Sequence, residues 1–191
     1  MPSVFDHDQQ YVEPLITQPP CIISVTGPES SGKTTLTRSL AHATGGIYVP
    51  EFARDYLNAH GPHYNIDDLI TIAQQQFTLM QDAISHAKHT GQQHVICDTD
   101  MTVMNIWADE KFGIVPQEIL ELRSAESFDL ILLCDPGDVP WEPDPLRENP
   151  YDRSRLFDRY RLSYDQLHRD YRVMQGSPEV RLERALKLTK A

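Results

Sequence analysis

One run of residues near the start of the chain has the spacing of a phosphate-binding loop. Residues 27–34 fit the pattern GxxxxGK(S/T). Glycine lets the backbone curl so that successive N–H groups face one anion, and a following helix adds its dipole. In such a loop Lys33 reaches the β- and γ-phosphates, and the Thr34 hydroxyl ligates Mg²⁺. The residues expected to bind the nucleotide are Gly27, Glu29, Ser30, Ser31, Gly32, Lys33, Thr34 and Thr35.

Acidic residues stand where two other predicted strands end. Glu51 directly follows one of these strands, and Asp98 and Asp100 follow the other. Ligands of a parallel α/β sheet bind at the carboxyl ends of its strands. A carboxylate there can hold Mg²⁺, as a Walker-B aspartate does, or take the proton of an attacking hydroxyl. We expect Thr34 and Asp98 to hold Mg²⁺, and either Glu51 or Asp98 to act on the acceptor hydroxyl.

Each acidic candidate also has a structural interpretation. Glu51 could begin a helix beside an i,i+3 ion pair with Arg54, which contributes only about a few tenths of a kcal/mol. An aspartate after a strand can cap the next helix, because Asp is among the best N-cap residues. We favour a chemical role for the aspartates, since two acidic residues at a strand end near phosphate are costly without a cation.

Arginine is concentrated late in the chain, where seven of the twelve arginines lie between residues 147 and 172. Its planar fork suits phosphate oxygens, and a loop can deliver it as a closing lid. Pairs such as Asp158–Arg161 and Asp165–Arg169 favour a solvated helix for the later members. The arginines expected to contact phosphate lie in or beside a proline-rich segment over residues 135–150: Arg147, Arg153 and Arg155.

Alternating apolar runs and amphipathic stretches predict the elements that position these residues. Short aliphatic runs predict strands over residues 21–26, 47–49, 94–97 and 130–134, and around Val173. Helices are predicted over residues 33–44, 51–60 and 66–89, in stretches broken near Gly113 and Pro116, along the apolar stripe 156–171, and after Ser177. Strands that alternate with helices form a parallel sheet covered on both faces. We therefore predict an α/β P-loop NTPase fold, with a five-stranded parallel sheet of order 2-3-1-4-5 flanked by helices.

Length and composition indicate one folded domain. The chain has 191 residues, of which 40% are hydrophobic and 24% charged, which suits a single buried core. Residues 1–20 are polar, show no clear period and end in two prolines, so we expect an N-terminal extension there. The domain is then expected over residues 21–191, with a lid over about residues 137–155.

The acidic charge balance limits the classes of partner. The chain has 17 Lys and Arg residues against 28 Asp and Glu, a net charge of −11. Binders of nucleic acid or of anionic membranes need a basic surface, whereas a few local donors suffice for phosphate. Apolar runs fall far short of the ~20 residues of a membrane span, and the sequence begins without a signal-peptide pattern. Three dispersed cysteines favour neither a disulfide scaffold nor a zinc site. We expect a cytoplasmic protein with a small-molecule partner, and the oligomeric state is left open, a homo-oligomer included.

Together these segments resemble the ribosylnicotinamide kinase domain of the NadR family, a branch of the P-loop AAA-like kinases. The resemblance covers about residues 20–190. Its most particular parts are the glutamate–arginine segment 50–56 and the tryptophan–arginine loop 139–147, because many enzymes share the phosphate loop. The other matching segments are residues 27–36, 97–100, 112–113, 132–135 and 155–157, together with Trp107.

The resemblance implies a kinase that uses ATP and Mg²⁺. The γ-phosphoryl group would pass to the 5′-hydroxyl of nicotinamide riboside, giving nicotinamide mononucleotide in NAD salvage. On this basis the expected catalytic residues are Lys33, Glu51, Asp98 and Arg147. The expected acceptor contacts are Glu51, Arg54, Asp100, Trp107 and Trp141. ATP would also contact Arg153, Arg155, Gly176 and Ser177. Family members often carry an adenylyltransferase or helix-turn-helix domain; neither motif occurs here, so we expect neither activity.

Two other functions stay open on the sequence alone. Another nucleoside or nucleotide kinase of the same fold would share these motifs, because acceptor choice depends on the shape of the pocket. An ATP-hydrolysing regulatory module that signals through a partner would use the same phosphate loop. The two tryptophans can stack on a ligand ring or simply pack, and the sequence does not separate ATP from GTP.

Overall fold

Five short strands form one parallel sheet in the computed structural model, which describes residues 18–144 and 151–190. The strands are β1 (Cys21–Thr26), β2 (Ile47–Val49), β3 (His94–Asp98), β4 (Leu130–Cys134) and β5 (Arg172–Met174). Every pairing between neighbours is parallel. The order β2-β3-β1-β4-β5 confirms the predicted order 2-3-1-4-5 and places β1, which precedes the phosphate loop, at the centre.

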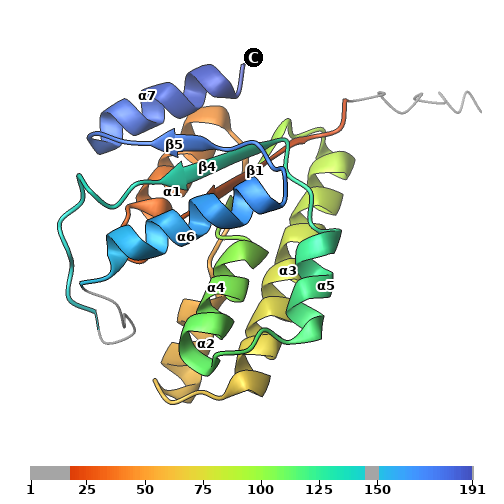
Figure 1. Ribbon diagram of the computed structural model, residues 1–191. Coiled ribbons are helices and arrows are strands. Elements are labelled where there is room, and N and C mark those ends of the chain that lie inside the picture. Colours follow the sequence, from red (N-terminus) through yellow and green to blue (C-terminus); the bar gives the residue numbers. More distant parts are fainter. Residues whose placement is uncertain (1–17, 145–150, 191) are drawn as a thin grey trace, which may run out of the picture.

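Helices cover both faces of this sheet (Figure 1). Within the described residues they are α1 (Lys33–Thr44), α2 (Phe52–His60), α3 (Ile66–Thr90), α4 (Met101–Phe112), α5 (Gln117–Ala125), α6 (Arg153–Gln166) and α7 (Pro178–Leu188). On one face, α1 and α7 pack on strand residues such as Ile23 and Ile96. On the other face, α3, α4 and α6 bury residues such as Val95 and Leu133. The outer helices α2 and α5 pack on α3 and α4.

The hydrophobic periodicity of the sequence predicts α3 correctly but predicts a helix that is longer than α6. The apolar side of α3 is buried as predicted at Leu69, Ala73, Met80, Ile84 and Ala87. The predicted stripe over residues 156–171 is too long, because α6 ends at Gln166 and Leu167 is 36% exposed. The chain turns there through His168, whose φ of 51° is incompatible with a continued helix.

A buried hydrogen-bond cluster joins α6, α4 and β1. The Tyr164 hydroxyl donates to Asp100 Oδ2 at 2.6 Å, and the Ser24 hydroxyl donates to the same oxygen at 2.8 Å. Asp100 Oδ1 accepts the backbone N–H groups of Thr102 at 3.0 Å and Val103 at 3.3 Å, so this carboxylate caps α4. These groups are removed from water, and losing one donor leaves its partner unsatisfied.

Substituting Tyr164→Phe should lower the free energy of unfolding by about 1–3 kcal/mol, because the variant leaves a buried carboxylate oxygen short of a donor. Urea denaturation followed by circular dichroism measures the loss. The matched control is Tyr151→Phe, because Tyr151 is 97% exposed and should lose nothing measurable. Equal stability of the two variants would contradict the importance of this cluster.

Candidate active site

The loop between β1 and α1 has the curled backbone that binding of phosphate requires. Its φ angles are positive at Gly27 (131°), Ser30 (53°) and Gly32 (84°). A Cβ on Gly27 would lie 2.7 Å from the carbonyl oxygen of Cys134, so only glycine lets the loop pass β4 this closely. The loop ends in the N-terminus of α1, where free N–H groups and the helix dipole favour an anion.

Two polar side chains of this loop have the arrangement of a site built for a ligand. The Lys33 ammonium donates to the carbonyl oxygen of Pro28 at 3.0 Å and so folds back on the loop. The Ser31 hydroxyl is buried and has no hydrogen-bond partner among the described residues. A buried hydroxyl without a partner costs about 1–3 kcal/mol, which a bound phosphate oxygen would offset.

Asp98 lies at the end of β3, fully buried. Its Oδ1 has no hydrogen-bond partner within the described residues, and Oδ2 accepts from the Tyr48 hydroxyl at 3.5 Å. Burial raises the pKa of Asp98 to about 6, and the charge of Glu51 adds to this rise. Contacts with the Thr34 and Tyr48 hydroxyls and the charge of Lys33 act in the opposite direction. A buried carboxylate with one oxygen that lacks a hydrogen-bond partner favours a cation beside it.

Asp98 and Asp100 have different surroundings, although only Thr99 stands between them in the chain. Thr99 has a φ of 95°, which is rare for a β-branched residue, while its N–H donates to the carbonyl oxygen of Val25 at 3.0 Å. Asp100 is buried, and both of its oxygens accept hydrogen bonds from protein groups. The structure therefore favours the helix-cap interpretation for Asp100, in place of the expected contact with an acceptor.

Glu51 and Arg54 flank the start of α2. Glu51 occupies the N-cap position, yet its side chain makes no capping hydrogen bond, so its carboxylate is not committed to the helix. Arg54 pairs with Asp144 at 2.8 Å, so the anticipated i,i+3 pair is replaced by a contact with the segment after β4. That pairing, with the charge of Glu51 nearby, raises the pKa of Arg54. The two residues thus lie on the Asp98 side of the site.

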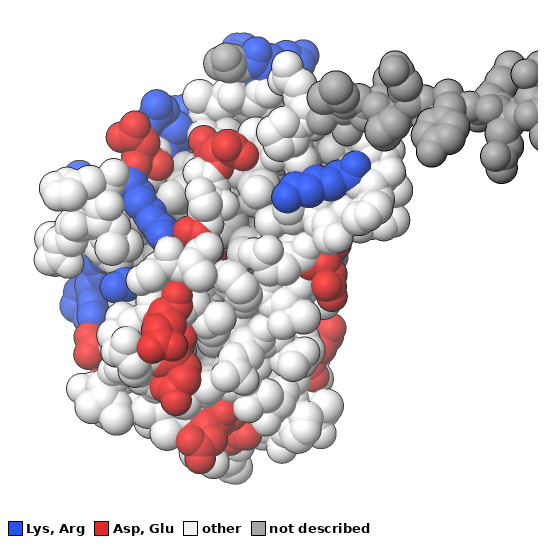
Figure 2. All heavy atoms as spheres, turned by 90° about the vertical axis from the view of Figure 1, so that its right-hand side faces the viewer, with Lys and Arg blue, Asp and Glu red and all other residues white. Residues whose placement is uncertain are grey.

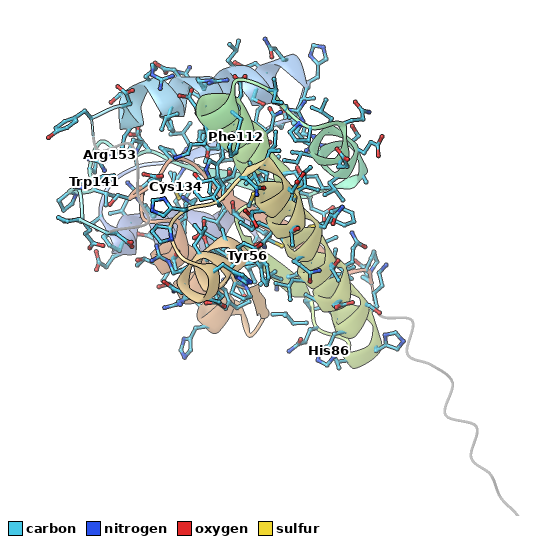
Figure 3. The ribbon with its side chains drawn as sticks, turned by 90° about the horizontal axis from the view of Figure 1, so that it is seen from below. Tyr56, His86, Phe112, Cys134, Trp141 and Arg153 are labelled. Carbon is cyan, nitrogen blue, oxygen red and sulfur yellow. The ribbon has the colours of Figure 1, made fainter. Side chains whose placement is uncertain are left out.

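The segment after β4 folds over the outside of the phosphate loop. The N–H of Glu142 donates to the Ser30 hydroxyl at 3.1 Å. Arg153 Nη1 donates to the carbonyl oxygens of Ser30 at 3.0 Å and Val139 at 2.8 Å. The Arg153 guanidinium also lies over the Trp141 ring at 5.8 Å, and Figure 3 shows these two side chains beside each other. Arg153 and Trp141 therefore lie beside the phosphate loop, where the guanidinium is bound to backbone carbonyls of that loop and of the segment after β4, and their contacts with ATP and the acceptor stay predictions.

Arg155 takes a different direction from the predicted one. Its guanidinium forms two hydrogen bonds of 2.8 Å to the Glu110 carboxylate on α4. Arg159 pairs with Glu110 and Asp109 on the same helix. These hydrogen bonds lower the pKa of Glu110 to about 2. Arg155 thus fastens α6 to α4 in this structure, and its expected contact with phosphate stays a prediction.

The remaining arginine predictions have mixed outcomes. Arg147 lies outside the described residues. The predicted Asp158–Arg161 pair is present at 3.6 Å. Arg169 pairs instead with the buried Glu126 at 3.0 Å. The partner of Arg169 differs from prediction because the residue lies beyond the end of α6, where helical spacing no longer applies.

Trp107, Gly176 and Ser177 have identifiable structural roles. Trp107 Nε1 donates to the Tyr64 hydroxyl at 2.6 Å, within an apolar cluster beneath the site. The Gly176 N–H donates to Asp138 at 2.8 Å, which fastens the loop after β5 to the segment after β4. Ser177 caps α7.

Arg181 on α7 is the residue of this site that the sequence analysis missed. It is 2% exposed, and its guanidinium donates to the carbonyl oxygens of Ser31, Asp135 and Gly176. A sequence signal existed, because Arg181 precedes the buried Ala185 by four residues and so occupies the apolar side of a short helix.

The surface remote from these loops carries scattered charge. Figure 2 shows the right-hand side of Figure 1, where small groups of acidic and basic side chains alternate with uncharged residues. No continuous basic stripe crosses the described residues on this face. None of the helices in residues 18–144 and 151–190 is long and apolar enough to cross a membrane.

A phosphate loop after the central strand of a parallel sheet, with carboxylates at the ends of neighbouring strands, defines a P-loop nucleotide-binding domain. The profile of the AAA domain family matches residues 22–181, and the chain belongs to that family. Over 131 residues it is 27% identical to the trifunctional NAD biosynthesis/regulator protein NadR of Salmonella typhimurium LT2 and to that of Escherichia coli K12. The match covers 65% of this chain and 30% of each relative, so the chain spans about a third of their length.

Solved structures show the same fold in kinases. NadR in complex with NR has a TM-score of 0.74 at 20% identity, over 88% of this chain and 50% of that one. A thymidylate kinase from Ehrlichia chaffeensis has a TM-score of 0.56 at 15% identity, over 90% of this chain and all of that one. The fold is therefore that of the P-loop kinases, as predicted.

The buried Asp98 should make the stability of the ligand-free protein depend on pH. A pKa raised from 3.8 to about 6 means that the folded state holds this proton more tightly than the unfolded state. Wild-type stability should fall relative to Asp98→Asn as pH rises from about 4 to 6, with a difference of up to about 3 kcal/mol above that window. Urea titrations at pH 4.0, 5.0, 6.0 and 7.5 measure it.

The control for this experiment is Asp170→Asn, since Asp170 is exposed. That variant should follow the wild type at every pH. A difference between wild type and Asp98→Asn that stays constant from pH 4.0 to 7.5 would contradict the raised pKa.

Proposed function

We propose that this chain is a kinase that transfers the γ-phosphoryl group of ATP to the 5′-hydroxyl of nicotinamide riboside. One observation carries the chemistry: a curled phosphate loop and a buried carboxylate, Asp98, meet at the centre of the sheet, with Glu51 beside them. The acceptor is supported by the similarity to NadR, one solved structure of which is a complex with NR. Another NadR structure is a complex with NAD and AMP-PNP, which supports ATP as donor.

The residues present fit a magnesium ion. The Thr34 hydroxyl lies near Asp98 and favours its charged form, and Asp98 Oδ1 has no hydrogen-bond partner among the described residues. Both side chains offer oxygen ligands of the kind Mg²⁺ takes together with substrate phosphates. No cluster of three or more acidic, His or Cys side chains in the described residues could hold a metal alone. We propose that Thr34 and Asp98 hold Mg²⁺, which would neutralise charge on the β- and γ-phosphates when bound.

The protein's own residues then position the reactants and stabilise charge. N–H groups of the phosphate loop and the Lys33 ammonium hold the phosphates in line with the acceptor. Glu51 is better placed than Asp98 to orient the acceptor hydroxyl and take its proton. It is half-buried, makes no capping hydrogen bond and stands at the end of the neighbouring strand, whereas Asp98 is fully buried against Thr34. Arg54, tied to Asp144, would close the acceptor side.

An alternative acceptor is a different nucleoside or a nucleotide. The observation that favours it is the fold shared with the thymidylate kinase and with a deoxyadenosine kinase from M. mycoides, which has a TM-score of 0.52. The phosphate loop also suits an ATP-hydrolysing regulatory module. A single assay of reaction products distinguishes these three functions.

Incubation of the chain with Mg·ATP and a panel of nucleosides, resolved by mass spectrometry, should give nicotinamide mononucleotide in step with ADP. Lys33→Ala should reduce turnover by at least about 100-fold, because the lysine stabilises the transferred charge. Lys88→Ala is the matched control, since Lys88 is an exposed lysine near the end of α3. A different phosphorylated product would support kinase activity but overturn nicotinamide riboside as the acceptor. ADP formation without any phosphorylated acceptor would favour the regulatory module.

Glu51→Gln should lower kcat by about 100- to 10,000-fold, which is the range for loss of a general base. Its KM for ATP should change less than about threefold, because Glu51 stands on the acceptor side. Steady-state kinetics with Glu118→Gln, an exposed glutamate of α5, as control would measure both constants. A kcat equal to that of the wild type would remove Glu51 from the mechanism.

A further inference from the structure

Arg181 joins three loops at the carboxyl edge of the sheet. Its Nη1 donates to the carbonyl oxygen of Ser31 at 2.6 Å, its Nη2 to that of Asp135 at 2.8 Å and its Nε to that of Gly176 at 2.9 Å. These acceptors belong to the phosphate loop after β1 and to the loops after β4 and β5. One buried side chain therefore sets the distances between the phosphate loop and both neighbouring loops.

The charge of Arg181 has no carboxylate partner in the described part of the chain, where its three hydrogen bonds all go to neutral carbonyl groups. Four other arginines of the domain meet a carboxylate, namely Arg54, Arg155, Arg159 and Arg169, whereas Arg153, which is only partly buried, also donates to carbonyl groups. A buried cation without a counter-ion is expensive, and breaking a buried pair is strongly destabilising for the same reason. An anion bound at the phosphate loop would supply the missing negative charge.

The geometry of the peptide group indicates on which side of the phosphate loop that anion would bind. In a trans peptide the carbonyl of one residue and the N–H of the next point in opposite directions, and no described peptide bond is cis. Because the Ser31 carbonyl accepts from Arg181, the Gly32 N–H points away from the guanidinium, toward the opposite side of the loop, which is here called its concave side. The Arg181 guanidinium lies against the convex side, where Nη1 would be 3.5 Å from a Cβ on Gly32.

The preceding peptide repeats this arrangement. Arg153 donates to the Ser30 carbonyl at 3.0 Å, which turns the N–H of Ser31 toward the concave side. The buried Ser31 hydroxyl has no protein partner among the described residues and lies in the same loop. Two guanidinium groups thus hold successive carbonyls outward, and two successive N–H groups and one hydroxyl are left for a ligand.

We propose that Arg181 is a positioning residue for the phosphate chain of the nucleotide. The Arg181 side chain orients the Ser31–Gly32 peptide group so that the Gly32 N–H faces the phosphates. The buried positive charge of Arg181 also favours binding of the phosphates, which would lie on the other side of this peptide group. This inference rests on the proposed use of ATP. It does not depend on which acceptor receives the phosphoryl group.

The test compares Arg181→Met and Arg181→Lys with Arg184→Met, a control three residues further along α7 at an exposed position. Isothermal titration calorimetry would measure binding of Mg·ATP, tripolyphosphate and AMP to each folded variant. Arg181→Met should weaken ATP and tripolyphosphate by about 10- to 100-fold, the range for a lost hydrogen bond to a charged group. AMP, which lacks the β- and γ-phosphates, should weaken less than about threefold, and Arg181→Lys should fall between Arg181→Met and the wild type.

A merely structural role would give a different pattern. It would weaken ATP, tripolyphosphate and AMP by the same factor, or leave all three unchanged, and either result overturns the proposal. If Arg181→Met does not fold, the same comparison is made with Arg181→Lys, for which equal binding of ATP relative to wild type is the contradicting result.

The outcome also separates this inference from the proposed kinase. A wild-type chain that binds ATP but phosphorylates no acceptor overturns the kinase and leaves the Arg181 comparison valid. A wild-type chain that phosphorylates its acceptor while Arg181→Met binds ATP normally overturns only the role of Arg181. Absence of ATP binding to the wild type would overturn both.

Discussion

Each peptide group that turns its N–H toward a bound anion turns its carbonyl the other way, and a buried carbonyl needs a donor. The phosphate loop meets this constraint through two arginines that come from distant helices, Arg153 on α6 and Arg181 on α7. The loop also passes so close to Cys134 that no side chain fits at Gly27. Its conformation therefore depends on β4, α6 and α7 as much as on its own glycines.

The acidic side of the site follows a second constraint, which is the cost of burying a carboxylate. Asp98 and Asp100 are two residues apart and both buried, yet they differ in every contact. Asp100 is satisfied by hydroxyl and backbone donors and holds α4, α6 and β1 together. Burial raises the pKa of Asp98, and one of its oxygens has no hydrogen-bond partner among the described residues, which suits this carboxylate to a cation. The unusual backbone at Thr99 separates these two roles.

The segment after β4 connects the phosphate loop with α2. It contacts the phosphate loop through Glu142, and α2 through the Asp144–Arg54 pair. Exposed ion pairs of this kind contribute only about 0–1 kcal/mol, so the Asp144–Arg54 contact can open at little cost. The contacts of Arg153 with backbone carbonyls are better shielded and hold the base of the segment.

The sequence by itself determined the features that are local in the chain. The spacing of the phosphate loop, the short aliphatic strands and the apolar side of α3 are present as predicted, because periodicity and glycine placement act over a few residues. The sheet order is also as predicted, although it is not local, since it pairs β1 with β3 and β4. Only the tertiary structure decided what each long charged side chain meets. Arg155 finds Glu110, 45 residues away, and Arg181 finds the Ser31 carbonyl, 150 residues away. A guanidinium binds carboxylates, phosphates and carbonyls alike, so its partner depends on which of them the fold brings within reach.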